Sequence, residues 1–403
     1  MDNTTNTQKH SVLIVGGGNG GISVAAQLLR KMPDLDIGII EPSEKHYYQP
    51  AWTLVGGGDF DIQKTVRHTQ EVMPSKVTWI KQYADTFLPE KNLVITKDGQ
   101  KIGYQYLVVS AGIQINWDWI EGLQETLGKN GVCSNYSFQT APYTFESLRK
   151  FKGGTILFTS PATPVKCGGA PQKIMYLAGD YLRKNGLLAQ ANIEFCNAGK
   201  VIFGIKKYAE TLNKVCERYG VTQNHRHELI SIDGDKKEAT FRVTHSDESK
   251  SMVVKKFDMI HVTPPQSAPD FVSNSPLADA NGWVDVDKHT LQHKKYTNVF
   301  GLGDVTNTPN AKTGAAIRKQ APVLVANLME VLHQKTPEQQ YNGYGSCPLV
   351  TGYGKLVLAE FDYDGNTVET FPFNQAKERY SMYLLKKKVL PWLYWNRILK
   401  GKA

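Results

Sequence analysis

One cysteine occupies a position where its thiol can be reactive. Cys167 lies beside Lys166, in a turn between a β-rich run at residues 155–159 and a helical pattern that includes Ile174 and Tyr181. A neighbouring ammonium group and the N-terminus of a helix both favour thiolate over thiol. Strand, turn and helix is also the layout of a dinucleotide site, but this turn has no G-x-G-x-x-G sequence for phosphate. The sequence therefore predicts a thiol site where a nicotinamide nucleotide could otherwise bind.

The other four cysteines differ in what they suggest. Cys347, in Tyr-Gly-Ser-Cys-Pro, is predicted to lie in a turn rather than a core strand, and only the fold can bring it near Cys167. Cys196 and Cys216 are predicted to be small buried core residues. The role of Cys133 stays open. No cysteines or histidines have the spacing of a zinc site, so no metal is expected.

A strand, a glycine-rich turn, a helix and a second strand follow one another near the N-terminus. They are predicted at residues 11–15, at the turn with Gly16, Gly18 and Gly21, at residues 22–31 and at residues 35–40. The second strand ends in Glu41, whose carboxylate can accept a hydrogen bond from a ribose 2′-hydroxyl and would repel a 2′-phosphate. Together these features predict a dinucleotide-binding βαβ unit.

Two later strands end in small residues that let backbone pass close to a cofactor. The strand at residues 106–110 is followed by Ala111, and the strand at residues 298–302 is followed by Gly303 and Asp304. The carboxylate of Asp304 can bond a ribose or ribityl hydroxyl.

A helix is predicted from near Thr313. Its N-terminus, together with Lys312, would face an electron-rich acceptor. Residues 42–58 are predicted to form a long functional loop, because their many aromatic residues argue against disorder.

Composition limits the class of protein. The chain has 403 residues, five cysteines and a formal net charge of +9, and it contains no apolar run long enough to span a bilayer. Residues 371–403 hold eight lysines or arginines and one glutamate, a net +7, so the rest of the chain is nearly neutral. This distribution argues against nucleic-acid binding. Only about ten polar residues precede the first predicted strand, so no targeting peptide and a cytoplasmic-side location are expected.

With these motifs together, the chain resembles the two-dinucleotide-domain flavoproteins of the glutathione reductase superfamily, and within it the sulfide:quinone oxidoreductases, most of all the branch that includes mitochondrial enzymes. The likeness extends from Ser11 to about Lys400. The motifs that carry it are residues 41–53, 164–175, 261–265, 301–304 and 346–353.

The resemblance implies an α/β fold with two Rossmann-like dinucleotide-binding domains and a C-terminal membrane-attachment region. It implies an FAD-binding domain at residues 9–118 and 257–333, a second domain at residues 119–256 that carries Cys167, and a C-terminal region at residues 334–403 that carries Cys347. FAD would lie against Gly16, Gly18, Gly21, Glu41, Ala111, Gly303, Asp304 and Lys312.

The resemblance also implies an enzyme that oxidises hydrogen sulfide and reduces a membrane quinone. Cys167 would be the thiolate at the flavin, and Cys347 would carry a persulfide. The small sulfur acceptor stays open between glutathione, sulfite, cyanide and polysulfide, and so does oligomerisation. Two alternatives remain: an NADH:quinone oxidoreductase of the same fold, and a membrane-attached flavoprotein that acts as a sensor.

The C-terminal tail combines aromatic residues with lysines. The apolar run at residues 389–395 is too short to cross a bilayer. Residues 380–398 suit attachment to one leaflet, which we expect on the cytoplasmic side of a bacterial-type inner membrane, with the quinone pocket beneath. The alternative is a helix docked on the protein's own core. If the tail is only an anchor, deletion from Lys386 onward should leave flavin reduction by sulfide intact.

Overall fold

The computed structural model describes residues 8–403. Its first sheet has seven strands in the order β5-β2-β1-β8-β7-β6, with β19 paired to β8. Strands β1, β2, β5, β8 and β19 run parallel to one another, whereas β7 pairs antiparallel with both β6 and β8. The strands are β1 (Gln8–Val15), β2 (Ile37–Ile40), β5 (Thr78–Ile80), β6 (Ala84–Leu88), β7 (Leu93–Thr96), β8 (Lys101–Val109) and β19 (Val299–Gly301).

The central strands of this sheet are continuous apolar runs because both faces are covered. Val12 and Ile14 pack on one side with helices α1 (Asn19–Lys31) and α9 (Gly314–Leu332), and Leu13 and Val15 pack on the other. The glycine turn lies between the carboxyl end of β1 and the N-terminus of α1.

The second sheet has five parallel strands in the order β10-β17-β11-β12-β13. The strands are β10 (Val132–Cys133), β11 (Gly154–Ser160), β12 (Ala191–Asn197), β13 (Val221–His225) and β17 (Met259–His261). The helices that accompany it are α5 (Ala141–Lys150), α6 (Ala170–Lys184) and α7 (Lys206–Arg218). A separate antiparallel sheet follows, formed by β14 (His227–Asp233), β15 (Glu238–Thr244) and β16 (Lys250–Lys256).

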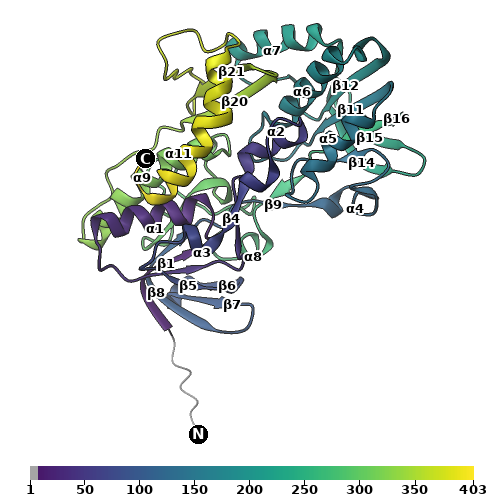
Figure 1. The fold of residues 1–403 in the computed structure, drawn as a ribbon. Helices are drawn as coiled ribbons and strands as arrows, with labels where there is room; N and C mark the ends of the chain where they lie inside the picture. The colour runs from purple at the N-terminus through teal and green to yellow at the C-terminus, as the bar shows by residue number, and fades with distance from the viewer. Residues whose placement is uncertain (1–7) are drawn as a thin grey trace.

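The expected α/β class is confirmed, and Figure 1 shows the two sheets side by side with the C-terminal segment across them. The chain leaves the first sheet after β8, builds the second, and returns to the first as β19, where Val299 pairs with Leu107. The division into domains at residues 118, 256 and 333 stays a prediction.

Short elements complete the described chain. They are β3 (Lys45–Tyr47), α2 (Trp52–Gly56), β4 (Val66–His68), α3 (Thr69–Val72), β9 (Gln114–Ile115), α4 (Leu123–Thr126), β18 (Gln266–Ser267) and α8 (Asp270–Ser273). The prediction of a loop over residues 42–58 was therefore wrong, because β3 pairs with β4 and α2 packs against α5.

The C-terminal region begins with a two-stranded sheet of β20 (Gly345–Gly352) and β21 (Lys355–Phe361). Cys347 lies inside β20 and is buried, so the predicted turn was wrong. Pro348 is tolerated in this strand because β20 pairs with β21 alone and keeps one open edge.

The last helical segment, which we call the strap, comprises residues 380–400. It contains α10 (Tyr380–Leu384), a π-helical turn at Leu385–Val389 and α11 (Leu390–Asn396). In Figure 1 the strap is the yellow helix that runs from β20 and β21 to α1. None of the helices between residues 8 and 403 is long and apolar enough to span a membrane.

Candidate active site

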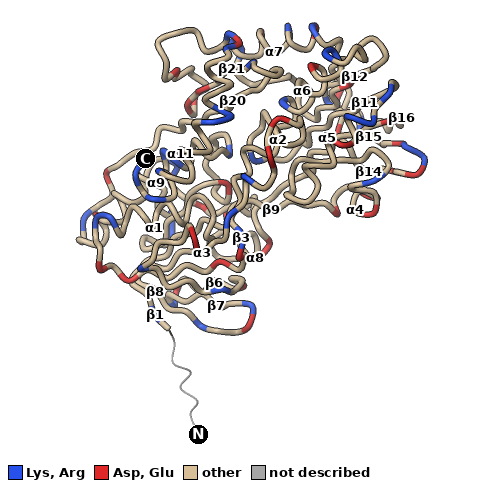
Figure 2. The backbone as a smooth tube through the Cα atoms, in the orientation of Figure 1, with Lys and Arg blue, Asp and Glu red and all other residues tan. Residues whose placement is uncertain are grey.

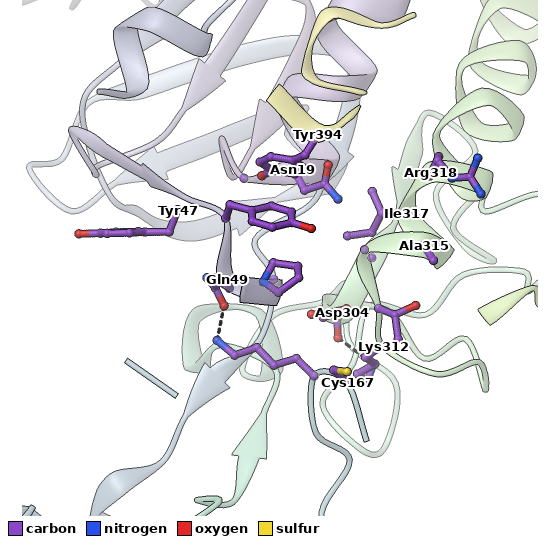
Figure 3. Close-up of a pocket in the computed structure, with 18 of the residues that line it drawn as sticks. Asn19, Tyr47, Gln49, Cys167, Asp304, Lys312, Ala315, Ile317, Arg318 and Tyr394 are labelled. Atoms are coloured by element: carbon purple, nitrogen blue, oxygen red, sulfur yellow. Dashed lines mark hydrogen bonds between the residues drawn. The ribbon is translucent and has the colours of Figure 1, made fainter. Parts of the chain in front are cut away.

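A cavity of about 620 Å³ lies where the glycine turn, the end of β8, the Cys167 turn and the strap meet. Its wall contains eight of the ten predicted site residues: Gly16, Gly18, Glu41, Ala111, Cys167, Gly303, Asp304 and Lys312. Figure 3 shows Asn19, the first residue of α1, at one end of the cavity, and Cys167 with Lys312 at the other. Gly21 and Cys347 lie behind the wall rather than in it.

The three glycines of the turn that were predicted to bind the cofactor have different reasons to be glycine. Gly16 has φ +101°, and a Cβ there would lie 2.6 Å from the Ser110 carbonyl oxygen. A Cβ on Gly21 would lie 2.0 Å from the Gly16 carbonyl oxygen, so Gly21 allows the helix to pack close to the turn. A Cβ on Gly18 meets no described atom within 4 Å and would enter the cavity instead. The turn thus leaves an open cradle at Gly18.

Glu41 closes this cradle from the end of β2. Its Oε2 accepts a hydrogen bond from the Gly17 N–H (2.8 Å), and its Oε1 accepts one from the Ser43 N–H (2.7 Å). Burial raises the pKa of Glu41, although the two backbone bonds oppose that rise. The carboxylate therefore fixes the glycine turn as well as facing the cavity.

Asp304 and Lys312 line the cavity near Cys167. The Lys312 Nζ donates to the carbonyl oxygens of Asp304 (2.7 Å) and Thr306 (2.9 Å), and burial lowers its pKa to about 8. Asp304 Oδ1 is buried without a hydrogen-bond partner among the described residues, and burial raises the pKa of this carboxyl. An unpaired buried acceptor requires a donor from a bound molecule or water.

The N-terminus of α9 also reaches the cavity. The Thr313 Oγ1 caps this helix by accepting from the Ala316 N–H (3.2 Å), and Gly314 and Ala315 lie in the wall. The sequence predicted this helix start, and its position is confirmed.

The two predicted redox cysteines meet. Interaction with the neighbouring Cys347 thiol is the main cause that holds the pKa of Cys167 well below its ordinary value. The same interaction, together with burial, raises the pKa of Cys347. The sequence could not place these side chains together, because the contact depends on β20 packing against α6.

Lys173 is the cation that touches the thiolate. Its Nζ lies 2.8 Å from the Cys167 Sγ, and its side chain is buried. The sequence analysis favoured Lys166, but the Lys166 Nζ donates to Gln49 Oε1 (2.5 Å) instead. Lys173 lies one turn into α6 and faces the thiol. Its place in the first turn of the predicted helix was the feature of the sequence that could have identified it.

The remaining cysteines are buried away from the cavity. Burial raises the pKa of Cys133 and of Cys196 to about 12 and that of Cys216 to about 11. The Cys133 thiol donates to the Ile260 carbonyl oxygen at 3.4 Å, inside the second sheet. All three have the environment of core residues.

A polar chamber of the cavity lies beside Cys167, formed by Asn135, Tyr136 and His261. The Asn135 amide atoms, the Tyr136 hydroxyl and the His261 Nδ1 are buried without partners among the described residues. His261 Nε2 accepts from the Asn135 backbone N–H at 3.1 Å, and burial lowers the pKa of this histidine to about 3. The neutral ring therefore carries its proton on Nδ1 and presents a free donor. The sequence analysis did not identify this chamber.

Strand β20 lies between the buried Cys347 side chain and a further part of the cavity wall, which we call the second lobe. Because side chains alternate along a strand, Cys347 faces the core beneath α6, while Ser346 and Pro348 face the lobe. On β21, Leu358 and Glu360 pair with these residues and face the same way. The strap covers this lobe with Leu385 and Lys386.

Comparison with known proteins gives a consistent assignment. No family model matches the chain. The chain is 50% identical over 394 residues to the mitochondrial sulfide:quinone oxidoreductase of Dictyostelium discoideum, an alignment that covers 97% of this chain and 86% of the relative. It is 48% identical over 392 residues to the mouse mitochondrial sulfide:quinone oxidoreductase, covering 97% of this chain and 87% of that protein.

The fold is similar to a solved sulfide:quinone oxidoreductase from the bacterium Aquifex aeolicus, with a TM-score of 0.81 at 20% identity, covering 97% of this chain and 92% of that one. A chain in the mitochondrial ATP synthase structure from Tetrahymena thermophila has the same fold, with a TM-score of 0.86 at 20% identity, covering 100% of this chain and 99% of that one. The fold alone is thus shared more widely, but the identity to the two mitochondrial enzymes extends over nearly the whole sequence. The chain belongs to the sulfide:quinone oxidoreductase family of enzymes.

Proposed function

We propose that this protein binds FAD and oxidises hydrogen sulfide through a Cys167–Cys347 pair, with a membrane quinone as the final electron acceptor. The observation that carries the proposal is the contact between the two thiols at the edge of the dinucleotide cavity, with Lys173 beside Cys167. Family membership supports the same reaction.

The cavity wall fits the parts of FAD. Gly18 leaves room for a pyrophosphate at the N-terminus of α1, and Glu41 lies where an adenosine ribose is held in such folds. Ala111 and Gly303 let backbone approach the cofactor, Asp304 offers an unpaired acceptor, and Lys312 offers a cation near it. When bound, the flavin accepts an electron pair from thiol chemistry and passes it to a quinone.

The thiol chemistry starts from the disulfide form of the pair. Hydrosulfide attacks the Cys347 sulfur, a new S–S bond forms, and Cys167 leaves as a thiolate. Lys173 stabilises that leaving thiolate, because its ammonium group lies within hydrogen-bonding distance. Cys347 then carries a persulfide, and Cys167 holds the electron pair that the cofactor takes.

A second nucleophile completes the turnover. It attacks the outer sulfur of the persulfide and frees Cys347, which restores the disulfide with Cys167 as the electron pair leaves. A thiol such as glutathione, sulfite, cyanide and a growing polysulfide all have the required chemistry. We propose that the chamber of Asn135, Tyr136 and His261 admits hydrosulfide, because its free donors suit a small anion.

The second lobe is our candidate for the quinone site. Pro348, Leu358, Phe371 and Leu385 give it an apolar lining, and the strap above it has an exposed outer face. On that face Tyr380, Val389 and Trp392 are 63%, 47% and 57% exposed, with the exposed cation Lys388 among them. Aromatic and basic side chains in this arrangement suit the headgroup region of one leaflet. Attachment there, and its assignment to the cytoplasmic side of a bacterial-type membrane, stay predictions.

An anaerobic titration tests the function. The purified FAD-loaded protein is mixed with sulfide, then separately with NADH, and the flavin absorbance is followed. Sulfide alone should bleach the flavin, whereas bleaching by NADH alone would support the NADH:quinone alternative. The Cys167→Ser and Cys347→Ser variants should each lose sulfide-dependent quinone reduction, and the matched Cys196→Ser control should keep it. Normal turnover by either of the first two variants would rule out the pair.

A further inference from the structure

The strap is tied by polar contacts to the segment that follows β2, and these contacts use two of the cations expected at a membrane. The Lys387 Nζ pairs with Asp59 at 2.6 Å, and the Tyr383 hydroxyl bonds the same carboxylate. The Lys386 Nζ donates to the Pro50 carbonyl oxygen at 2.7 Å, and its side chain is buried. Part of the positive charge of the tail therefore serves docking on the protein itself. Figure 2 shows further lysine and arginine residues, in blue, along the strap.

The inner face of the strap is part of the cavity wall. Leu390, Leu393, Tyr394 and Ile398 line the cavity, and Figure 3 shows Tyr394 next to Asn19 at the end where the cradle begins. Beyond α11 the chain packs on α1 itself: a Cβ on Gly401 would lie 2.8 Å from the Gln27 backbone nitrogen. The strap thus covers the helix whose N-terminus faces the phosphate cradle.

One buried hydrogen bond and one contact with the backbone link the strap to the glycine turn. The Tyr394 hydroxyl and His46 Nε2 are 2.6 Å apart, and both side chains are buried. The other contact of the imidazole is with the Gly17 backbone carbonyl, and burial lowers the pKa of His46 to about 4. The ring is neutral, with one proton, and a carbonyl can only accept. The His46 N–H therefore points to Gly17, and Nε2 accepts from Tyr394.

Aromatic packing reinforces this contact. The Tyr394 ring lies 4.8 Å from the Tyr48 ring and 5.0 Å from the Trp395 ring, centroid to centroid. The Arg67 guanidinium lies 4.4 Å from the Trp395 ring centroid. The outer face of the same short helix carries exposed Trp392. One helix therefore has one face on the cofactor cavity and the other in solvent.

We infer that the strap is a cofactor-retaining wall, and that Tyr394 and His46 are positioning residues that hold the glycine turn in its binding geometry. Because the outer face of α11 is the surface we propose for lipid contact, lipid binding and cofactor retention are coupled: lipid stabilises the docked strap, and the docked strap slows loss of FAD. The second half of this inference rests on the proposed membrane attachment. The first half rests only on the contacts within the protein.

This inference reverses the expectation for a tail that is only an anchor. A chain truncated before Tyr380 lacks six residues of the cavity wall: Leu385, Lys386, Leu390, Leu393, Tyr394 and Ile398. Such a protein should lose FAD, and not only its attachment to lipid.

The first experiment measures FAD release in solution. The FAD-loaded full-length protein is diluted, and the rise of free-flavin fluorescence gives the release rate. Tyr394→Phe keeps the ring but loses the donor to His46, so release should be about fivefold faster, the factor that corresponds to one ordinary hydrogen bond. The matched control Tyr380→Phe, on the exposed outer face, should release FAD at the wild-type rate. The truncated chain should release FAD more than about tenfold faster.

The thermal unfolding of the apo forms separates positioning from general destabilisation. The apo Tyr394→Phe and apo wild-type proteins should unfold at nearly the same temperature, while their FAD release rates differ. Equal FAD release rates for wild type and Tyr394→Phe would overturn the positioning role. This comparison decides the matter even if the truncated chain does not fold.

The second experiment adds vesicles of phosphatidylcholine and phosphatidylglycerol to the same release assay. Bound vesicles should slow FAD release from the wild type at least about threefold, and Trp392→Ser should abolish that slowing while keeping the wild-type rate without vesicles. Vesicle binding without any change in release rate would overturn the coupling. Absence of vesicle binding would overturn the membrane attachment, and the solution comparison would still decide the role of Tyr394.

Discussion

At Cys167, a neighbouring thiol and a buried lysine set the reactivity. Interaction with the Cys347 thiol is the largest cause of the lowered pKa of Cys167, and the charge of Lys173 adds to it. Because the pKa of Cys167 is lowered, its thiolate forms at a lower pH than an ordinary thiolate does and is lost as the pH falls through that lowered value. A leaving thiolate of this kind would make the Cys167 side of the proposed disulfide the easier side to release.

Replacing Lys173 should move this titration. In Lys173→Met the thiolate loses its cation, so the pKa of Cys167 should rise and the acid limb of alkylation by iodoacetamide should shift to higher pH. The shift should be at least about one unit, the scale of a close opposite charge. The control is Lys166→Met, whose Nζ contacts Gln49 rather than the thiol. An unchanged alkylation profile in Lys173→Met would contradict this assignment.

Lys386 makes a second prediction at the same scale. Burial lowers its pKa from 10.5 to about 7, so the unfolded chain binds one more proton than the folded protein between these values. The free energy of unfolding therefore rises from pH 7 towards pH 10.5, and below pH 7 the full penalty of burying the charged form is present.

Lys386→Met should remove that penalty. Its free energy of urea unfolding relative to wild type should be higher at about pH 6.5 than at about pH 9.5, because only the wild type bears the cost of burying a charged lysine at the lower pH. The lost bond to Pro50 affects both conditions alike. The same difference at both pH values would show that Lys386 does not titrate in this range.

At the scale of elements, packing of the glycine turn against α1 and space for the cofactor depend on two different glycines. Gly21 allows helix and turn to pack, and Gly18 keeps the cradle open. A pair of alanine variants separates these tasks.

Gly21→Ala should lower the thermal unfolding temperature of the apoprotein, because its Cβ would lie 2.0 Å from the Gly16 oxygen. Gly18→Ala should leave that temperature nearly unchanged, since no described atom lies within 4 Å and φ is −78°, yet the purified protein should contain much less FAD. Full flavin occupancy in Gly18→Ala would contradict the cradle.

The elements also show what the sequence could and could not predict. The βαβ unit was predictable because strand, turn and helix are adjacent in the sequence and each carries its own local signal. Cys347 was misplaced because its neighbours Gly345 and Pro348 indicate a turn, while the strand is stabilised by β21 and α6, which lie far away along the chain. The chamber around His261 was not predictable for the same reason. It joins residues from β17 to residues 135 and 136 only in the folded protein.

At the scale of the whole molecule, the C-terminal charge has two uses. Lys386 and Lys387 face inward, whereas Lys388, Arg397 and Lys400 are exposed, as is Trp392. The structure confirms docking on the core for the inner face of this segment, and the membrane anchor stays a prediction for its exposed face.

Vesicle binding should accordingly have a salt-dependent and a salt-resistant part. Lys388→Ala should weaken cosedimentation with anionic vesicles at low salt, by roughly 1 kcal/mol, and much less at high salt. Trp392→Ser should weaken it at both. Lys250→Ala, on the exposed strand β16, is the control and should bind as wild type does. Equal binding by Lys388→Ala and wild type at low salt would exclude lipid contact by this face.

The position of the strap in the sequence has a consequence for how the enzyme is made. Residues 380–400 leave the ribosome after every other part of the cavity wall has been synthesised. If the protein binds FAD as proposed, the cofactor can enter a nascent chain whose cradle is complete and still open, and docking of Tyr394 on His46 then closes the wall behind it. If the docked strap retains FAD as inferred, loading of the finished protein requires the strap to undock first. Flavin supplied during translation should consequently be incorporated faster than flavin added to the completed apoprotein.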